Sequence, residues 1–116
     1  MTASLRELAR RTYLFSCSHE AAGGIYGHNY RLEIRYELHD DTAAREAEAR
    51  IQKHLIDRIH SRDLCADRAL FDGRTVLDDR AIARVLLGKA AELAAPIKLE
   101  SAVLYRNDKD AIEIAF

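Results

Sequence analysis

Residues 28–39 read HNYRLEIRYELH, and this stretch decides the fold. Aromatic or aliphatic side chains stand at Tyr30 and at every second position as far as Leu38. Charged side chains stand at the positions between them, from Arg31 to Glu37. A period of two places the two sets on opposite faces of a β-strand. The stretch therefore predicts a long strand with one buried face and one face in contact with water.

A second alternating run lies upstream, over residues 12–19. It places Tyr13, Phe15 and Cys17 on one face, followed by His19, while Thr12 begins the opposite face. Two glycines then permit a tight reversal in the stretch AAGG, residues 21–24. We expect the two runs to pair as a long antiparallel hairpin.

After the hairpin the apolar period lengthens, which predicts helices. Asp40, Asp41 and Thr42 offer capping side chains, and an amphipathic helix of about four or five turns follows them. Its apolar positions are Ala47, Ile51, Leu55, Ile56 and Ile59. A second helix is expected to begin at Asp78-Asp79 and to end before Pro96.

The rest of the chain predicts an irregular connection and a second hairpin. Residues 61–75 lack a period and contain the turn signal Asp72-Gly73, while residues 97–105 and 111–116 alternate around a turn at 107–110. The expected order is ββααββ in a single domain, residues 1–116. We expect an α+β fold with a four-stranded antiparallel sheet and both helices on one face.

Composition excludes several classes of function. The formal net charge of −1 gives no general attraction to nucleic acid or to an anionic membrane. The N-terminal residues 1–11 carry no apolar segment of a secretory signal, so a cytoplasmic location is expected. Cys17 and Cys65 lack metal-ligand spacing and are interpreted as free thiols, one in a strand and one near a helix end.

Two segments resemble the 6-pyruvoyl-tetrahydropterin and 6-carboxy-tetrahydropterin synthases. They are Phe15–His19, read FSCSH, and Tyr26–Tyr30, read YGHNY, and Tyr105–Asp108 is similar to a later segment of that family. The resemblance covers nearly the whole chain and implies the tunnelling fold. It also implies a pterin-like small-molecule ligand and a homo-oligomer, with a hexamer as one candidate, whose site lies between subunits.

The resemblance implies a zinc site, of which this chain keeps two ligands. In the family three histidines bind zinc, one from the first strand and two from alternate positions of the second. His19 and His28 match two of these positions, and Tyr26 stands at the third. A phenol has a pKa of about 10, so it is a poorer zinc ligand than imidazole near neutral pH. In a site without metal, Tyr26 is a candidate proton carrier or oxyanion donor.

Three further positions depart from the family pattern. Ala22 stands where many members have a catalytic cysteine. His60 is the nearest match to the family's catalytic histidine, with Asp63 as the candidate to orient it, because Ile59 replaces the usual aspartate. Arg106 replaces the glutamate that anchors pterin, so a donor stands in place of an acceptor and Arg106 becomes a candidate substrate-binding residue.

These residues leave more than one function open. The first is a lyase or aldolase-like enzyme that acts on the side chain of a dihydroneopterin-type substrate, with His60 and Tyr26 moving protons. The second is a catalytically silent subunit of the same fold that binds a heterocycle or serves assembly. A third is an enzyme for a different heterocycle, in which Arg106 reads an acidic group.

Overall fold

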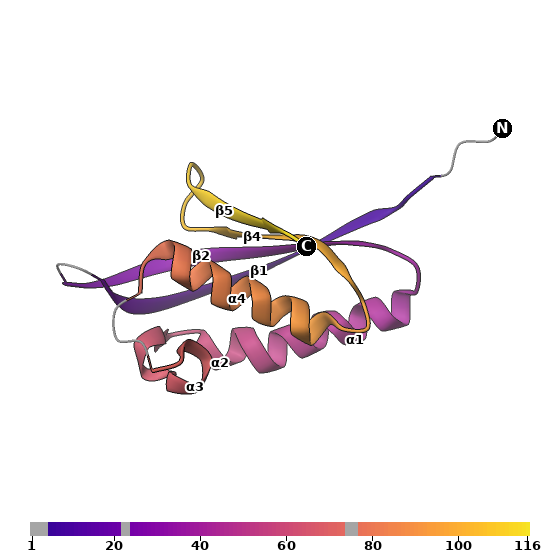
Figure 1. Cartoon of the computed structure of the whole chain (residues 1–116). Coiled ribbons are helices and arrows are strands. Elements are labelled where there is room, and N and C mark those ends of the chain that lie inside the picture. Colours follow the sequence, from indigo (N-terminus) through magenta and orange to yellow (C-terminus); the bar gives the residue numbers. More distant parts are fainter. Residues whose placement is uncertain (1–4, 22–23, 74–76) are drawn as a thin grey trace.

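The computed structural model describes residues 5–21, 24–73 and 77–116, so the expected reversal at Ala22-Gly23 and the end of the connection at Thr75 lie outside the described residues. A β-sheet packs on a layer of helices (Figure 1). The strands are β1 (Leu8–Ala21), β2 (Gly24–Glu37), β3 (Arg62–Asp63), β4 (Leu99–Tyr105) and β5 (Ala111–Ala115). The helices are α1 (Asp41–Ile51), a π-helical turn (Gln52–Ile56), α2 (Asp57–Ile59), a 3-10 turn (Leu64–Ala66), α3 (Arg68–Phe71) and α4 (Asp79–Ala94).

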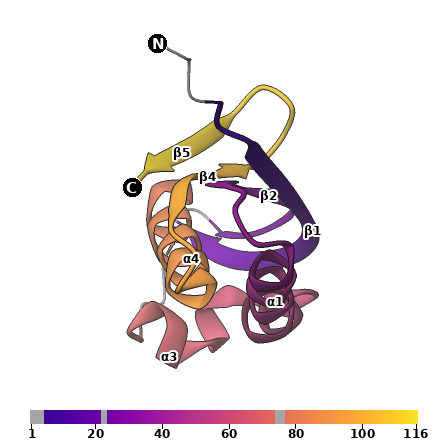
Figure 2. The ribbon, with the colours of Figure 1, turned by 90° about the vertical axis from the view of Figure 1, so that its right-hand side faces the viewer.

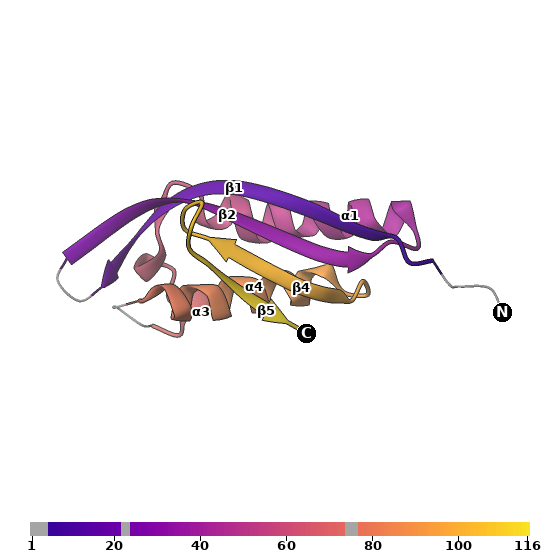
Figure 3. The same ribbon diagram turned by 90° about the horizontal axis from the view of Figure 1, so that it is seen from above.

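The predicted hairpin is confirmed over its whole length. β1 and β2 pair antiparallel from Leu8 opposite Glu37 to Ala21 opposite Gly24. The expected faces are confirmed too, because Tyr30 and the alternate residues to Tyr36 are buried against the helices. Figure 3 shows the closed end of this hairpin reaching beyond the helices.

The two predicted helices form the second layer, and the end-on view in Figure 2 shows α1 and α4 on the same side of the sheet. The Asp40 side chain accepts hydrogen bonds from the amides of Thr42 and Ala43 and so caps α1. The Asp78 side chain caps α4 in the same way, through the amide of Ala81. The helices bury the apolar positions expected from the sequence, including Ile51, Leu55, Ile82 and Leu86.

The sheet has a fifth strand, which corrects the prediction of four antiparallel strands. β3 lies in the connection that lacked a sequence period, and it pairs in parallel with Cys17 and Ser18 of β1. The strand order is β3-β1-β2-β4-β5, so the sheet is mixed and the chain runs ββ-α-β-α-ββ. Ser61 makes this return possible by adopting a left-handed backbone conformation, with φ of 61°. A strand of two residues is too short to produce a period.

The alternation expected for β4 is interrupted. The register shifts where Arg35 and Tyr36 of β2 meet β4, so that Leu99 pairs with Tyr36 while Ala102 pairs with Ile34. An extra residue in one strand moves the following side chains to the other face. The core face of β4 therefore consists of Leu99, Ala102 and Leu104, rather than an unbroken series of alternate residues.

The outer edge of β1 is closed over only part of its length. The carbonyl of Ser16 accepts from the amide of Ser61, and the carbonyl of Glu20 accepts from the amide of Leu77. Upstream of Ser16, the paired strands of the described chain leave this edge without a neighbour over Leu8–Leu14. No helix in the described ranges is long and apolar enough to span a membrane.

Candidate functional site

The pairing of β1 with β2 brings three sequence-predicted side chains together on the helix-facing side of the sheet. His19 lies directly opposite Tyr26, and His28 lies opposite Cys17, in the register of β1 and β2. Tyr26 and His28 are two residues apart on one strand, so their side chains share this face. The register thus assembles the cluster that we call the ring cluster: His19, Tyr26 and His28.

The rings of this cluster are close neighbours. The ring centroids of His19 and His28 are 5.5 Å apart, and those of His19 and Tyr26 are 6.2 Å apart. The rings of Tyr26 and His28 are parallel within 2°, with centroids 6.5 Å apart. That separation matches the rise of about 6.6 Å over two residues of a strand. The cluster is therefore a compact aromatic surface with four imidazole nitrogens and one phenol.

His19 is the buried member of the ring cluster and lacks polar contacts. Only 3% of its surface is exposed, and neither Nδ1 nor Nε2 has a hydrogen-bond partner in the described part of the chain. The nearby Tyr30 hydroxyl is also buried without a partner among those residues. Buried polar groups without partners are costly, and in native proteins they often mark a position where a ligand or water binds.

The start of α4 and the end of β4 close the site. Asp78 and Asp79 stand at the first turn of α4, and Arg106 follows the last residue of β4. Arg106 Nη1 donates to Asp79 Oδ2 at 2.7 Å, and Arg106 Nη2 lies 3.6 Å from Asp110 Oδ2. The predicted substrate-binding residue Arg106 therefore lies beside the ring cluster, with its guanidinium already paired with carboxylates.

These groups line one cavity of about 590 Å³. Its walls are His19, Tyr26, His28, Asp78, Asp79, Arg106 and Asn107. Cavities of this size accommodate small-molecule ligands. Burial lowers the pKa of His28, and His19 lowers it further, whereas Asp79 acts in the opposite direction. His28 is consequently a neutral imidazole near pH 7, able to accept a proton.

The ring cluster does not fit the three-histidine zinc site that the resemblance implies. Among residues 5–21, 24–73 and 77–116, no three His, Cys, Asp or Glu side chains are arranged to hold a metal ion. His19 and His28 supply two imidazoles, while Tyr26 offers a phenol that must lose its proton before it binds zinc well. We therefore derive no chemical step through a metal.

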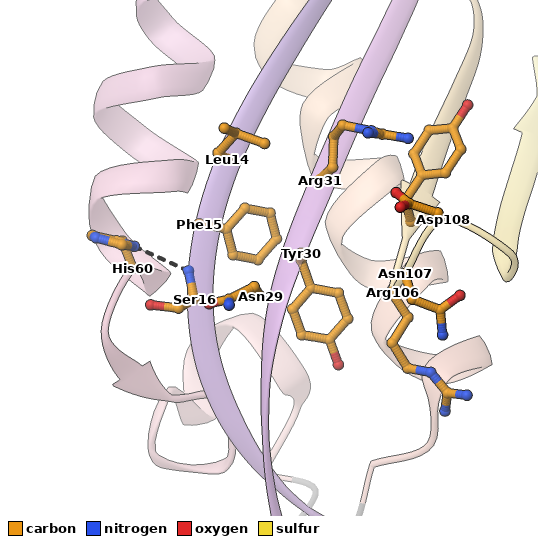
Figure 4. A pocket seen from close by; sticks show the side chains of 11 residues that line it. Leu14, Phe15, Ser16, Asn29, Tyr30, Arg31, His60, Arg106, Asn107 and Asp108 are labelled. Carbon is orange, nitrogen blue, oxygen red and sulfur yellow. Dashed lines mark hydrogen bonds between the residues drawn. The ribbon is translucent and has the colours of Figure 1, made fainter.

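His60 and Asp63 lie outside this cavity. His60 Nδ1 accepts a hydrogen bond from the Ser16 amide at 3.1 Å, so its proton resides on Nε2. Figure 4 shows a second cavity, of about 370 Å³, whose lining includes both His60 and Arg106 on opposite sides of the β1–β2 hairpin. Asp63 does not hydrogen-bond to His60; its Oδ1 accepts from the amide of Cys65 and caps the 3-10 turn. Within one chain, both predicted catalytic residues lie at the outer edge of β1: His60 accepts from the Ser16 amide, and Asp63 belongs to β3, which pairs with β1.

The remaining sequence candidates are also placed. Burial, with a smaller contribution from Asp63, raises the pKa of the Cys17 thiol to about 12, so Cys17 is not a thiolate near neutral pH. Ala22, at the position of the family's cysteine, lies outside the described residues. Glu100 pairs with Arg6 at the other end of β4, so it supplies no acceptor to the cavity.

The acidic pair Asp78-Asp79 is the part of the site that sequence reasoning missed. From the sequence, both residues predict only the start of a helix. Asp78 does perform that capping role, but one capping carboxylate is enough for a helix start. Asp40 and Asp41 begin α1 in the same arrangement, so the sequence carries no signal that separates Asp79 from an ordinary helix start.

Comparison with known proteins bears on the fold. No protein-family model and no curated sequence matches the chain. Among solved structures, 6-pyruvoyl tetrahydropterin synthase from Caenorhabditis elegans aligns with a TM-score of 0.72 and 16% sequence identity, covering 100% of this chain and 99% of that one. This chain has the fold of 6-pyruvoyl tetrahydropterin synthase.

A second solved structure supports the same assignment. The uncharacterized protein WS1659 from Wolinella succinogenes aligns with a TM-score of 0.65 and 14% identity, covering 97% of this chain and 99% of that one. The tunnelling fold expected from the resemblance is thus confirmed over the full length of the chain. At such low identities the likeness establishes the pterin-synthase fold alone, and activity has to be argued from the cavity.

Proposed function

We propose that the chain is a pterin-processing lyase or aldolase-like enzyme that acts on the side chain of a dihydroneopterin-type substrate. The observation that carries the proposal is the ring cluster, which lines a ligand-sized cavity together with Asp79 and Arg106. Its chemistry supports the proposal because it combines a neutral imidazole, a phenol and flat aromatic surfaces.

The chemical step uses His28 as the base. His28 accepts the proton of a substrate hydroxyl whose carbon is joined to the carbon next to a ring C=N bond. The O–H electron pair forms a carbonyl, the C–C bond breaks, and its electron pair moves into the C=N bond to give the conjugate base of an enamine. Tyr26, 43% exposed, then donates its phenolic proton to the carbon that lost its bond. Tyr26 regains a proton from water, and the hydroxide left behind takes the proton held by His28, so both residues are regenerated. This sequence needs no oxidant and no metal.

The experiment is a turnover assay with dihydroneopterin and its triphosphate, in which the products are separated chromatographically. We expect conversion by the wild-type chain and a loss of about 100-fold or more in the variant His28→Ala, which removes the base. His54→Ala is the matched control, because His54 is an exposed histidine on the helical layer, remote from the cavity. An unchanged substrate with wild-type protein at high enzyme concentration would rule out the enzyme.

The alternative is a catalytically silent subunit that binds the heterocycle. It is favoured by the position of His60, whose Nδ1 is engaged with the Ser16 amide, and by the high pKa of Cys17. Binding without turnover identifies this function. Quenching of pterin fluorescence by the protein, together with an unchanged substrate in the turnover assay, is its expected result.

Assembly and metal content complete the proposal. We propose a homo-oligomer, with a hexamer as one candidate, because the outer edge of β1 over Leu8–Leu14 and the outer edge of β5 are unpaired within the described chain. A second copy is then the route by which His60 Nε2 approaches the cavity of the ring cluster, which His60 does not line within one chain. Zinc, held by His19 and His28 alone, is expected to be weakly bound, and elemental analysis should give clearly less than one zinc per chain.

A further inference from the structure

We propose that Asp79, held in place by Arg106, is the specificity-determining acceptor that binds the amino and ring N–H edge of a 2-amino-4-oxo heterocycle in the cavity. This inference rests on the proposed function, and it names the residue pair that selects the ligand. Asp79 and Arg106 are brought together by the packing of α4 against β4, which no sequence motif indicates.

The hydrogen bonds leave one Asp79 oxygen available. Oδ2 accepts from Arg106 Nη1 at 2.7 Å, while Oδ1 makes no hydrogen bond within the described ranges. Asp78 differs in this respect, because its Oδ1 already accepts from the Ala81 amide at 2.7 Å. The Arg106 bond fixes the Asp79 carboxylate at the cavity wall, so the acceptor is oriented before a ligand arrives.

The charges of the cavity favour a ligand that donates hydrogen bonds. Two carboxylates, Asp78 and Asp79, line the cavity with a single guanidinium, and Asp110 lies 3.6 Å from the same guanidinium. An acidic ligand group would meet this carboxylate excess at close range. The hypothesis that Arg106 reads an acidic group is therefore disfavoured.

A ligand site is indicated independently by His19. His19 is only 3% exposed and lines the same cavity. Both of its ring nitrogens lack a hydrogen-bond partner among the described residues. The parallel rings of Tyr26 and His28 provide flat surface beside it. A planar heterocycle satisfies both features, because its ring contacts the aromatic faces and its polar atoms reach the imidazole.

The ligand edge follows from the donor and acceptor pattern of the pair. A carboxylate accepts two neighbouring N–H groups, and a guanidinium donates to a carbonyl oxygen. A 2-amino-4-oxo-pyrimidine ring carries an amino group, a ring N–H and a carbonyl in that order along one edge. Oδ1 of Asp79 accepts from one of the two donors, the second lone pair of Oδ2 accepts from the other, and Arg106 donates to the carbonyl. A 2,4-dioxo ring replaces the amino donor by an acceptor, which would face the Asp79 carboxylate.

The experiment compares two pteridines by isothermal titration calorimetry near pH 7. Pterin (2-amino-4-oxopteridine) and lumazine (2,4-dioxopteridine) share N3–H and the 4-oxo group and differ in the 2-substituent, with lumazine also carrying a hydrogen on N1. We expect wild-type protein to bind pterin at least about tenfold more tightly, and Asp79→Asn to lose that preference, because the amide presents a donor to the lumazine carbonyl. Asp110→Asn is the matched control, since it removes the other carboxylate near Arg106 and lies outside the cavity.

The outcomes separate this inference from the proposed function. If wild-type protein binds neither pteridine, the proposed function and the inference both fail. If wild-type protein prefers pterin and Asp79→Asn keeps the same ratio, the inference alone is overturned. A thermal melt establishes that each variant is folded, and Asp79→Glu, which retains the carboxylate, is expected to keep a pterin preference even if Asp79→Asn is unstable.

Discussion

Arg50 closes the carboxyl end of α4, and its replacement by methionine gives a quantitative test of how the helical layer is held. Arg50 Nε donates to the Leu93 carbonyl at 2.8 Å, and Nη2 donates to the carbonyls of Ala95 at 2.9 Å and Ala94 at 3.3 Å. The last carbonyls of a helix have no partner within the helix, and a positive charge there also interacts favourably with the helix dipole.

The magnitude follows from these contacts. Two of the three bonds are short and come from a charged donor, and each contributes about 1 kcal/mol after the carbonyls regain water in the variant. The helix dipole adds about 0.5 kcal/mol. Methionine keeps the aliphatic stem of Arg50, so packing losses are small. We expect Arg50→Met to lower the free energy of unfolding by about 2–3 kcal/mol.

The assay is urea denaturation followed by far-ultraviolet circular dichroism. Arg45→Met is the matched control, because Arg45 is an exposed arginine on α1 and makes no hydrogen bond or ion pair to the described residues; its change is expected to stay within about 0.5 kcal/mol. A similar slope of free energy against urea in all variants makes the midpoints comparable. If Arg50→Met were as stable as Arg45→Met, the assignment of Arg50 as the cap of α4 would be refuted.

Two further predictions concern titrating groups. The pKa of His28 is lowered by burial and by His19, so the acidic limb of kcat/KM for the proposed reaction should be centred below about pH 6.5, as the base is protonated; a limb centred above that pH would contradict the assignment. Because the pKa of His28 is lower in the folded state, its contribution to the free energy of unfolding is fully present above about pH 6.5. This contribution is lost as the pH falls further. Cys17, whose pKa burial raises to about 12, should resist iodoacetamide in native protein at about pH 8 and react after denaturation, as peptide mass spectrometry would show.

Sequence reasoning predicted the elements whose faces repeat. Over β2, one face is buried from Tyr30 to Tyr36 and the other is charged, so a period of two identified the buried residues correctly. A period of two does not identify the buried residues of β4, because Ser101 and Val103 are buried as well as Ala102 and Leu104, downstream of the extra residue at the register shift. Because a bulge depends on the neighbouring strand, the sequence of β4 alone does not reveal it.

In the candidate site, too, the residues on paired strands could be predicted from the sequence, and those brought together by tertiary packing could not. His19, Tyr26 and His28 could be grouped in advance, since they lie on paired strands and strand geometry determines their faces. The Arg106–Asp79 ion pair joins residues 27 positions apart on a strand and a helix, and only tertiary packing brings them together. The bond from the Ser16 amide to His60 is similar, because it depends on the left-handed turn at Ser61.

The partly closed edge of β1 has a consequence for how far a neighbouring strand can extend. Backbone groups of alternate residues point outward from a strand edge, so Leu8, Arg10, Thr12 and Leu14 present theirs upstream of Ser16. At Ser16 both outward groups are already engaged, by His60 and by the Ser61 amide. An added strand therefore stops there, after about seven residues or roughly 23 Å. The hydrogen bonds of His60 and Ser61 to Ser16 therefore set the limit of pairing for any strand added to this edge.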